Sequence, residues 1–131
     1  MSIVIDPSAG SITGVTQPLA VGTAVNAGDA ITKSAAEGQM LGVGQTWQLV
    51  TRTAGTTYTN STGKPIQLNL KSYGSASAKV EITIGGVLAS AIEFSALNIL
   101  HEQTVIIPNG IAYSFAVPAG TRNGGSATEL R

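Results

Sequence analysis

Hydrophobic and polar residues alternate with a period of two along three stretches of the chain. The positions on the hydrophobic side are Ile66, Leu68 and Leu70, then Val80, Ile82 and Ile84, and finally Ile111, Tyr113, Phe115 and Val117. This period is typical of β-strands with one face in a protein core and the other in water. The core is therefore predicted to contain Leu68, Leu70, Val80, Ile82, Ile84, Tyr113 and Phe115.

Turn signals separate these stretches. Gly85-Gly86 lies between two alternating runs and predicts a two-residue hairpin turn with positive φ angles. Asn60–Lys64 and Pro108–Gly110 are rich in residues that favour turns. About seven or eight short strands at this spacing predict an all-β fold, a jelly-roll-like antiparallel β-sandwich over Leu41–Arg131. We expect little helix after Gln39.

Residues 1–40 differ in composition and are predicted to form an extended N-terminal arm. They are mostly Ala, Gly, Ser, Thr and Val, whereas the one Trp, three Tyr and two Phe all lie at or after Trp47. Such a segment alone buries too little apolar area to offset the entropy lost on ordering. Two short β-like stretches are predicted at Ser2–Ile5 and Gly14–Thr16, and a helix over Ala30–Gln39.

The predicted helix has boundary signals, with Asp29 as N-cap and Gly38 as stop. Two interpretations of the arm stay open, a disordered leader and a docking arm that orders against a partner. We favour the docking arm, in which Ile3–Ile5 adds a strand to the exposed sheet edge of a partner. Alternatively, the arm folds back onto its own sandwich and closes an edge strand.

Charge and composition argue against several classes of function. Charged residues are 11% of the chain, and seven basic residues balance seven acidic ones. A nucleic-acid groove needs clustered Lys and Arg, so we expect no nucleic-acid partner. A net charge near zero promotes association, which favours a subunit of a larger assembly. The chain has no cysteine, no secretory signal and no apolar run near the ~18 residues of a membrane span. We therefore expect cytoplasmic synthesis, no disulfide and no membrane insertion.

No catalytic constellation is visible, so we expect no enzymatic activity and no catalytic, cofactor-binding or metal-binding residues. His101 lacks the partners of a catalytic triad, because its neighbour Glu102 would point to the opposite face of a strand. A single histidine without cysteine does not supply the three protein ligands of a zinc site, and we expect His101 on the surface or in an interface. Glu81, Glu93 and Glu102 permit a glycosidase-like carboxylate pair without indicating one.

Three further motifs have structural interpretations that we favour. Gly42–Gly44 lacks the remaining glycine of a dinucleotide fingerprint and is expected to form a turn. Asn60–Thr62 matches a glycosylation sequon, which acts only in a secretory context. Trp47 and Tyr58 could form a sugar-stacking platform, but we expect Trp47 to pack in the core.

The stretch Leu41–Ile66, LGVGQTWQLVTRTAGTTYTNSTGKPI, resembles a segment of tail-fibre and other small virion structural proteins of tailed bacteriophages. The wording is most similar in Gly42–Gln48 and Thr56–Ile66, and the resemblance covers Leu41–Arg131. In that family the segment opens a compact terminal β-sandwich, so the resemblance implies this architecture. It also implies a non-enzymatic structural protein of a phage or prophage virion.

The resemblance implies a short tail fibre or tail-tip adhesin that serves host attachment, with the tail as the favoured location. Family members with a fibre role usually carry long stalks, whereas residues 1–40 precede the sandwich here. A capsid decoration protein, tied to the head shell by its arm, is therefore the alternative, and an envelope-degrading enzyme is a weaker one. The expected partners are further copies in a homotrimer or, as second choice, a pentamer, other virion proteins bound through the arm, and a host surface glycan or protein.

Overall fold

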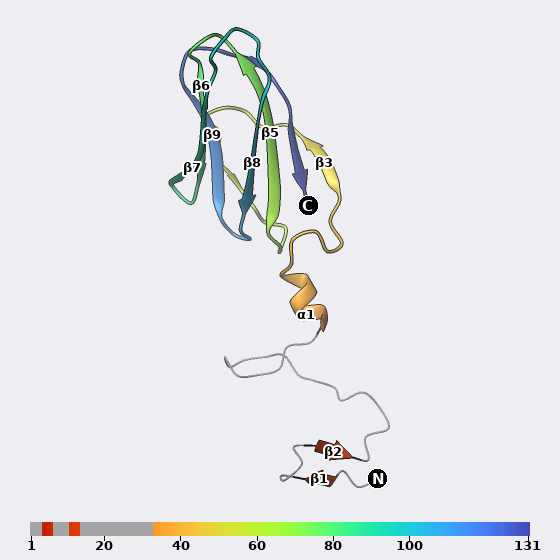
Figure 1. Ribbon diagram of the computed structural model, residues 1–131. Helices are drawn as coiled ribbons and strands as arrows, with labels where there is room; N and C mark the ends of the chain where they lie inside the picture. Colours follow the sequence, from red (N-terminus) through yellow and green to blue (C-terminus); the bar gives the residue numbers. More distant parts are fainter. Residues whose placement is uncertain (1–3, 7–10, 14–32) are drawn as a thin grey trace. The chain divides into compact units, whose positions relative to one another are not determined.

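The computed structural model describes residues 4–6, 11–13 and 33–131, which fall in two compact units, Met1–Ala36 and Glu37–Arg131 (Figure 1). In the first unit, β1 (Val4–Asp6) pairs antiparallel with β2 (Ser11–Thr13). The helix α1 spans Lys33–Gly38. No other helix occurs among the described residues, which agrees with the expectation of little helix after Gln39.

The arm predictions are confirmed in part. The expected strand Ser2–Ile5 overlaps β1, which extends to Asp6. The helix ends at Gly38 as predicted, while the proposed cap Asp29 lies outside the described residues, as does the expected strand Gly14–Thr16. The strand β2 was not predicted, because its short Ser-Ile-Thr sequence gives no alternation to recognise.

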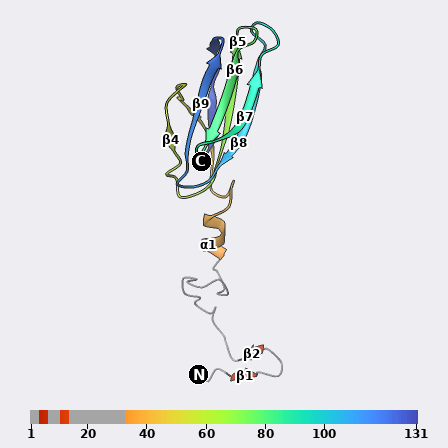
Figure 2. The ribbon, with the colours of Figure 1, turned by 90° about the vertical axis from the view of Figure 1, so that its left-hand side faces the viewer.

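The second unit is built almost entirely of strands. They are β3 (Trp47–Val50), β4 (Tyr58–Thr59), β5 (Ile66–Gly74), β6 (Lys79–Ile84), β7 (Val87–Glu93), β8 (His101–Ile107), β9 (Ala112–Ala119), β10 (Arg122–Gly124) and β11 (Ala127–Leu130). They form two antiparallel sheets that pack face to face. One contains β10, β5, β11 and β3 with β8 on the other edge of β5, and the other has the order β4-β9-β6-β7 (Figures 1 and 2).

β10 and β11 are two halves of one bulged strand. Their pairing with β5 runs in one direction from Arg122 opposite Gly74 to Leu130 opposite Gln67. Reciprocal backbone hydrogen bonds between Lys71 and Ser126 bridge the two halves. With this strand counted once, the sheets have the orders β3-β11-β5-β8 and β4-β9-β6-β7, which is the arrangement of a jelly roll. The predicted all-β, jelly-roll-like sandwich is thus confirmed.

The core lies between the sheets. The predicted core residues Leu68, Leu70, Val80, Ile82, Tyr113 and Phe115 are buried. Ile84 is only partly buried and packs against the others. Ile66, which the alternation placed on the inward face, is also buried, and the core further contains Ala78, Phe94, Ile107 and Ala127, which were not predicted. Phe94 was missed because it follows β7 in a segment without alternation, where its backbone N–H bonds the carbonyl of Ala78 at 2.9 Å.

Two turn predictions are confirmed by the backbone. Gly85 and Gly86 have φ angles of 58° and 81° and join β6 to β7, so both occupy the left-handed region that a type I′ hairpin turn requires. Gly42 and Gly44 likewise have positive φ and form the expected turn before β3. The side chain of Gln45 fixes this turn, because its Oε1 accepts from the N–H of Gly42 at 2.5 Å.

Asn60 organises the turn between β4 and β5. Its side chain is buried, and its Nδ2 donates to the carbonyls of Lys64 at 2.7 Å and Ile107 at 3.0 Å. Its Oδ1 accepts from the N–H and the hydroxyl of Thr62. The amide of the sequon Asn60–Thr62 is therefore engaged in holding the turn together.

Candidate functional site

His101, which we expected on the surface or in an interface, is half-buried and packs against the core. It lies on β8 opposite Ser72, a residue whose side chain faces the interior, and this register turns His101 inward. Its ring packs edge-on against Phe94, with ring centroids 4.9 Å apart. Glu102 points to the opposite face, as predicted, where it lies 3.8 Å from the Lys71 amine.

Of the three glutamates considered for a carboxylate pair, Glu102 lies apart from the other two. Glu81 and Glu93 flank Lys79 on the outer face of the β4-β9-β6-β7 sheet, and Glu81 lies 2.6 Å from the Lys79 amine. Glu102 lies on the other sheet. In the part of the chain that the structure describes, no three His, Cys, Asp or Glu side chains gather as a metal site would require. No helix in that part is both long and apolar enough to cross a bilayer.

The prediction that Trp47 packs in the core is wrong. Trp47 is 52% exposed and pairs with Leu130, whose neighbour Glu129 faces inward, so Trp47 lies on the outer face of its sheet. Tyr58 belongs to the other sheet, where its ring packs 5.8 Å from that of Tyr113. The two aromatic residues therefore do not form a common platform.

A charged cluster lies buried between the sheets, which sequence reasoning did not predict. Glu129 is completely buried, and its Oε1 lies 2.6 Å from Nη2 of Arg52. The same oxygen accepts hydrogen bonds from Nε of Arg52 at 2.8 Å and from the hydroxyl of Tyr113 at 2.5 Å. Oε2 accepts from Nη1 of Arg131 at 3.0 Å. The carboxylate is therefore fully bonded, as a buried charge must be.

Strand geometry brings the cluster together. Ala127 and Glu129 are the buried positions of β11, and the period of two places Arg131 on the same side. β3 ends at Val50, so this edge of the sandwich is left open. The Arg52 side chain fills the opening, where its guanidinium lies 4.5 Å from the centre of the Tyr58 ring.

The cluster shifts the pKa values of its members. Burial, followed by the hydrogen bond to Glu129, raises the pKa of Tyr113 to about 12. Burial lowers the pKa of Arg52, but its bonds and charge interactions with Glu129 and Tyr113 outweigh this and the net shift is upward. The hydrogen bond from the Thr53 N–H lowers the pKa of Tyr58. The pKa values of the two packed tyrosines, Tyr58 and Tyr113, are thus shifted in opposite directions.

We expect Tyr113 to make stability fall at high pH. An unfolded tyrosine loses its proton near pH 10, whereas folded Tyr113 keeps it until about pH 12. Between these pH values the folded state binds more protons than the unfolded state. The contribution of Tyr113 to the free energy of unfolding is therefore fully present below pH 10 and is lost as the pH rises toward 12. Urea unfolding at several pH values between about 9 and 11.5 should show a steeper loss for the natural protein than for Tyr113→Phe. Equal slopes would contradict the assignment.

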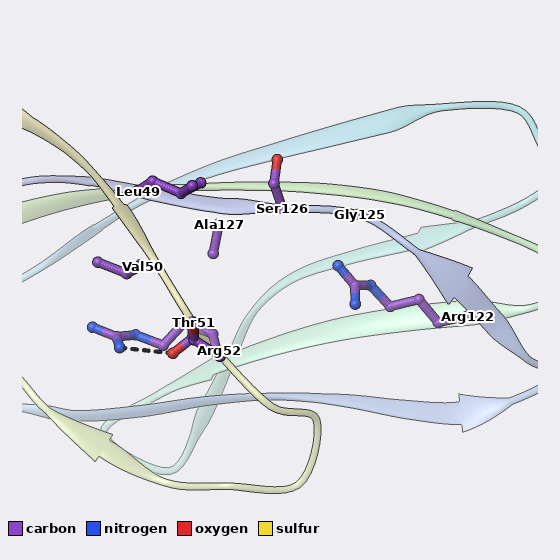
Figure 3. A pocket seen from close by; sticks show the side chains of 8 residues that line it. All are labelled: Leu49, Val50, Thr51, Arg52, Arg122, Gly125, Ser126 and Ala127. Atoms are coloured by element: carbon purple, nitrogen blue, oxygen red, sulfur yellow. Dashed lines mark hydrogen bonds between the residues drawn. The ribbon is translucent and has the colours of Figure 1, made fainter.

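A pocket of about 260 Å³ opens beside the cluster, where β3 separates from the bulged strand (Figure 3). Leu49, Val50, Thr51 and Arg52 line it from β3 and the segment that follows. Arg122, Gly125, Ser126 and Ala127 line it from the bulged strand. Figure 3 shows the Arg122 side chain extending toward Ala127, while the Arg52 side chain points away from Arg122. The two guanidinium groups therefore do not converge on one point.

The local sequence pattern contained little information about this region. In the segment Ala127–Leu130, hydrophobicity alone would place Leu130 inside, yet the buried side chain is Glu129. Its partner Arg52 lies 77 positions away in the sequence. Comparisons of the chain with protein-family models, curated proteins and solved structures found no match.

Proposed function

We propose that this chain is a non-enzymatic structural subunit of a tailed-phage or prophage particle, namely a short tail fibre or tail-tip adhesin that serves host attachment. The observation that carries the proposal is a group of large hydrophobic side chains on the outer face of the β3-β11-β5-β8 sheet, which lie uncovered in the described unit. The resemblance of Leu41–Ile66 to virion proteins supports the same conclusion.

The strand register places three apolar residues and one polar residue of this face in a single row. Trp47 pairs with Leu130, Leu130 with Gln67, and Gln67 with Ile106, so the four form one row across the sheet. Trp47 is 52% exposed and Ile106 is 56% exposed. Leu49, in the next row, is 78% exposed. Apolar side chains clustered in this way are typical of surfaces that bind another protein.

This face supports self-association, and we propose a homotrimer with a pentamer as second choice. The number of copies rests on the family resemblance. The arm would then connect the assembly to other virion proteins. A capsid decoration protein has the same requirements, an arm for attachment and a compact outer domain, and is the alternative function.

Deleting the gene separates the two functions. A tail fibre or adhesin predicts particles with intact heads that no longer adsorb to the host. A decoration protein predicts normal adsorption with heads that break on heating or osmotic shock. If particles without the chain adsorb and resist heating as normal particles do, both proposals are wrong.

Removing residues 1–38 should separate attachment from stability. Because the arm is poor in large apolar residues, we expect the thermal transition of the remaining sandwich to stay nearly unchanged. Incorporation of the truncated chain into particles should fail. Calorimetry of the purified protein and immunoblots of purified particles measure the two effects. A much lower transition temperature would instead show that the arm is part of the folded domain.

A further inference from the structure

Arg122 is anchored between the sheets at the pocket described above. It faces inward from β10, and its guanidinium lies 5.2 Å from the centre of the Phe115 ring. Its Nε donates to the hydroxyl of Ser72 at 2.9 Å, and its Nη2 donates to the carbonyl of Lys71 at 3.0 Å. These bonds hold one side of the guanidinium, while Nη1 donates to no acceptor in the described part of the chain.

The charge of Arg122 lacks a counter-ion. Arg52 and Arg131 share the carboxylate of Glu129, whereas no carboxylate lies within 4.0 Å of Arg122 among the described residues. Arg122 is nevertheless half-buried, and burial lowers its pKa. A half-buried arginine with free donors is suited to bind an anion, because a planar carboxylate can accept two of its N–H groups.

Gly125 keeps the guanidinium accessible. It has a φ of 142° and lies between β10 and β11, just after the bulge between Arg122 and Gly124. A Cβ at this position would clash with the Lys71 carbonyl and with Nη2 of Arg122. A side chain here would therefore displace the arginine from the Lys71 carbonyl, and this position depends on glycine.

The remaining walls of the pocket are amphipathic. Thr51 carries a hydroxyl group, and Leu49, Val50 and Ala127 supply apolar surface, while the Ser126 hydroxyl points away from Arg122 (Figure 3). The volume of about 260 Å³ lies just below the range of roughly 300–1,000 Å³ of pockets for drug-sized ligands. One sugar unit has the matching properties, with hydroxyl groups along its edge and an apolar C–H face.

We propose that the pocket binds the carboxylate of an acidic monosaccharide unit of the hexuronate class, with Arg122 as the carboxylate ligand. As a means of host recognition, this inference rests on the attachment function proposed above. The binding site itself does not, because it can be measured on the isolated protein. Thr51 contacts the sugar hydroxyls, and the apolar wall packs against the ring.

Two-dimensional NMR of the full chain, titrated with D-glucuronate, tests the proposal. Saturable shifts at the amides of Gly125 and Ser126 and at the Arg122 Nε–H are expected in the millimolar range, as for a single small ligand. D-glucose tests the need for the carboxylate, and acetate tests the need for the sugar; each should bind about tenfold more weakly or not at all. Inorganic phosphate tests for a general anion site and should also bind more weakly.

Three variants make the test specific. Arg122→Gln should weaken glucuronate binding by about tenfold or more, because it removes a charged hydrogen bond. Thr51→Val removes the hydroxyl that contacts the sugar, keeps the branched shape of the side chain and should weaken binding even if Arg122→Gln fails to fold. Lys79→Gln, on the other sheet, removes a positive charge away from the pocket and should leave binding unchanged.

Several results would overturn the proposal. These are no saturable shift with glucuronate, equal binding of acetate or phosphate, or unchanged binding in Thr51→Val. None of them bears on where the chain lies in a particle, so the failure of this inference is distinguishable from failure of the proposed function.

Discussion

Replacing Glu129 by alanine is expected to lower the free energy of unfolding by about 3–5 kcal/mol, the usual cost of removing one partner of a buried ion pair. The substitution leaves Arg52, whose side chain is 13% exposed, without its counter-charge. It also removes the acceptor of the Tyr113 hydroxyl, which is buried. Urea denaturation followed by tryptophan fluorescence measures the effect.

Two further variants identify the cause of this loss. Glu102→Gln removes an exposed carboxylate 3.8 Å from Lys71 and should cost only about 0–1 kcal/mol. The double variant Glu129→Leu with Arg52→Met replaces both charges by apolar groups and should be more stable than Glu129→Ala, because no uncompensated Arg52 charge remains. If Glu129→Ala costs no more than Glu102→Gln, water reaches the cluster and the carboxylate is not truly buried.

Replacing Ile82 by alanine is expected to cost about 2–5 kcal/mol, through lost burial and the cavity that remains. Ile82 is completely buried at the centre of the β4-β9-β6-β7 sheet. The matched control is Ile106→Ala, which removes the same atoms from a strand position that is 56% exposed. The control should cost well under half as much in the same denaturation experiment. Similar losses at both sites would show that the inward and outward faces have been confused.

Much of the fold could be predicted because the strands obey local rules. Leu68, Leu70, Val80 and Ile82 alternate with polar residues, and burial of one sheet face requires this pattern. The Gly85-Gly86 turn could also be predicted from local sequence, because a turn with two consecutive positive φ angles favours glycine. These features depend on residues that are close in the sequence.

The edge strands and the charged cluster could not be predicted in this way. Trp47 was expected inside because large aromatic residues are usually buried, but β3 is a short edge strand whose outer face is uncovered in the described unit. Glu129 was not considered because its burial depends on Arg52, Tyr113 and Arg131, which meet it only after the two sheets have packed. The pocket beside Arg122 depends in turn on Gly125, where a side chain would clash with the Lys71 carbonyl and the Arg122 guanidinium.

The position of the chain in an intact particle tests the central claim most directly. Electron cryo-microscopy of purified particles should reveal density that fits the jelly roll of residues 37–131 at the tail tip or in a short fibre, with threefold symmetry. Mass spectrometry of the same particles should detect the chain. Density for the jelly roll on the head shell, or the absence of the chain from purified particles, would contradict the proposed tail function.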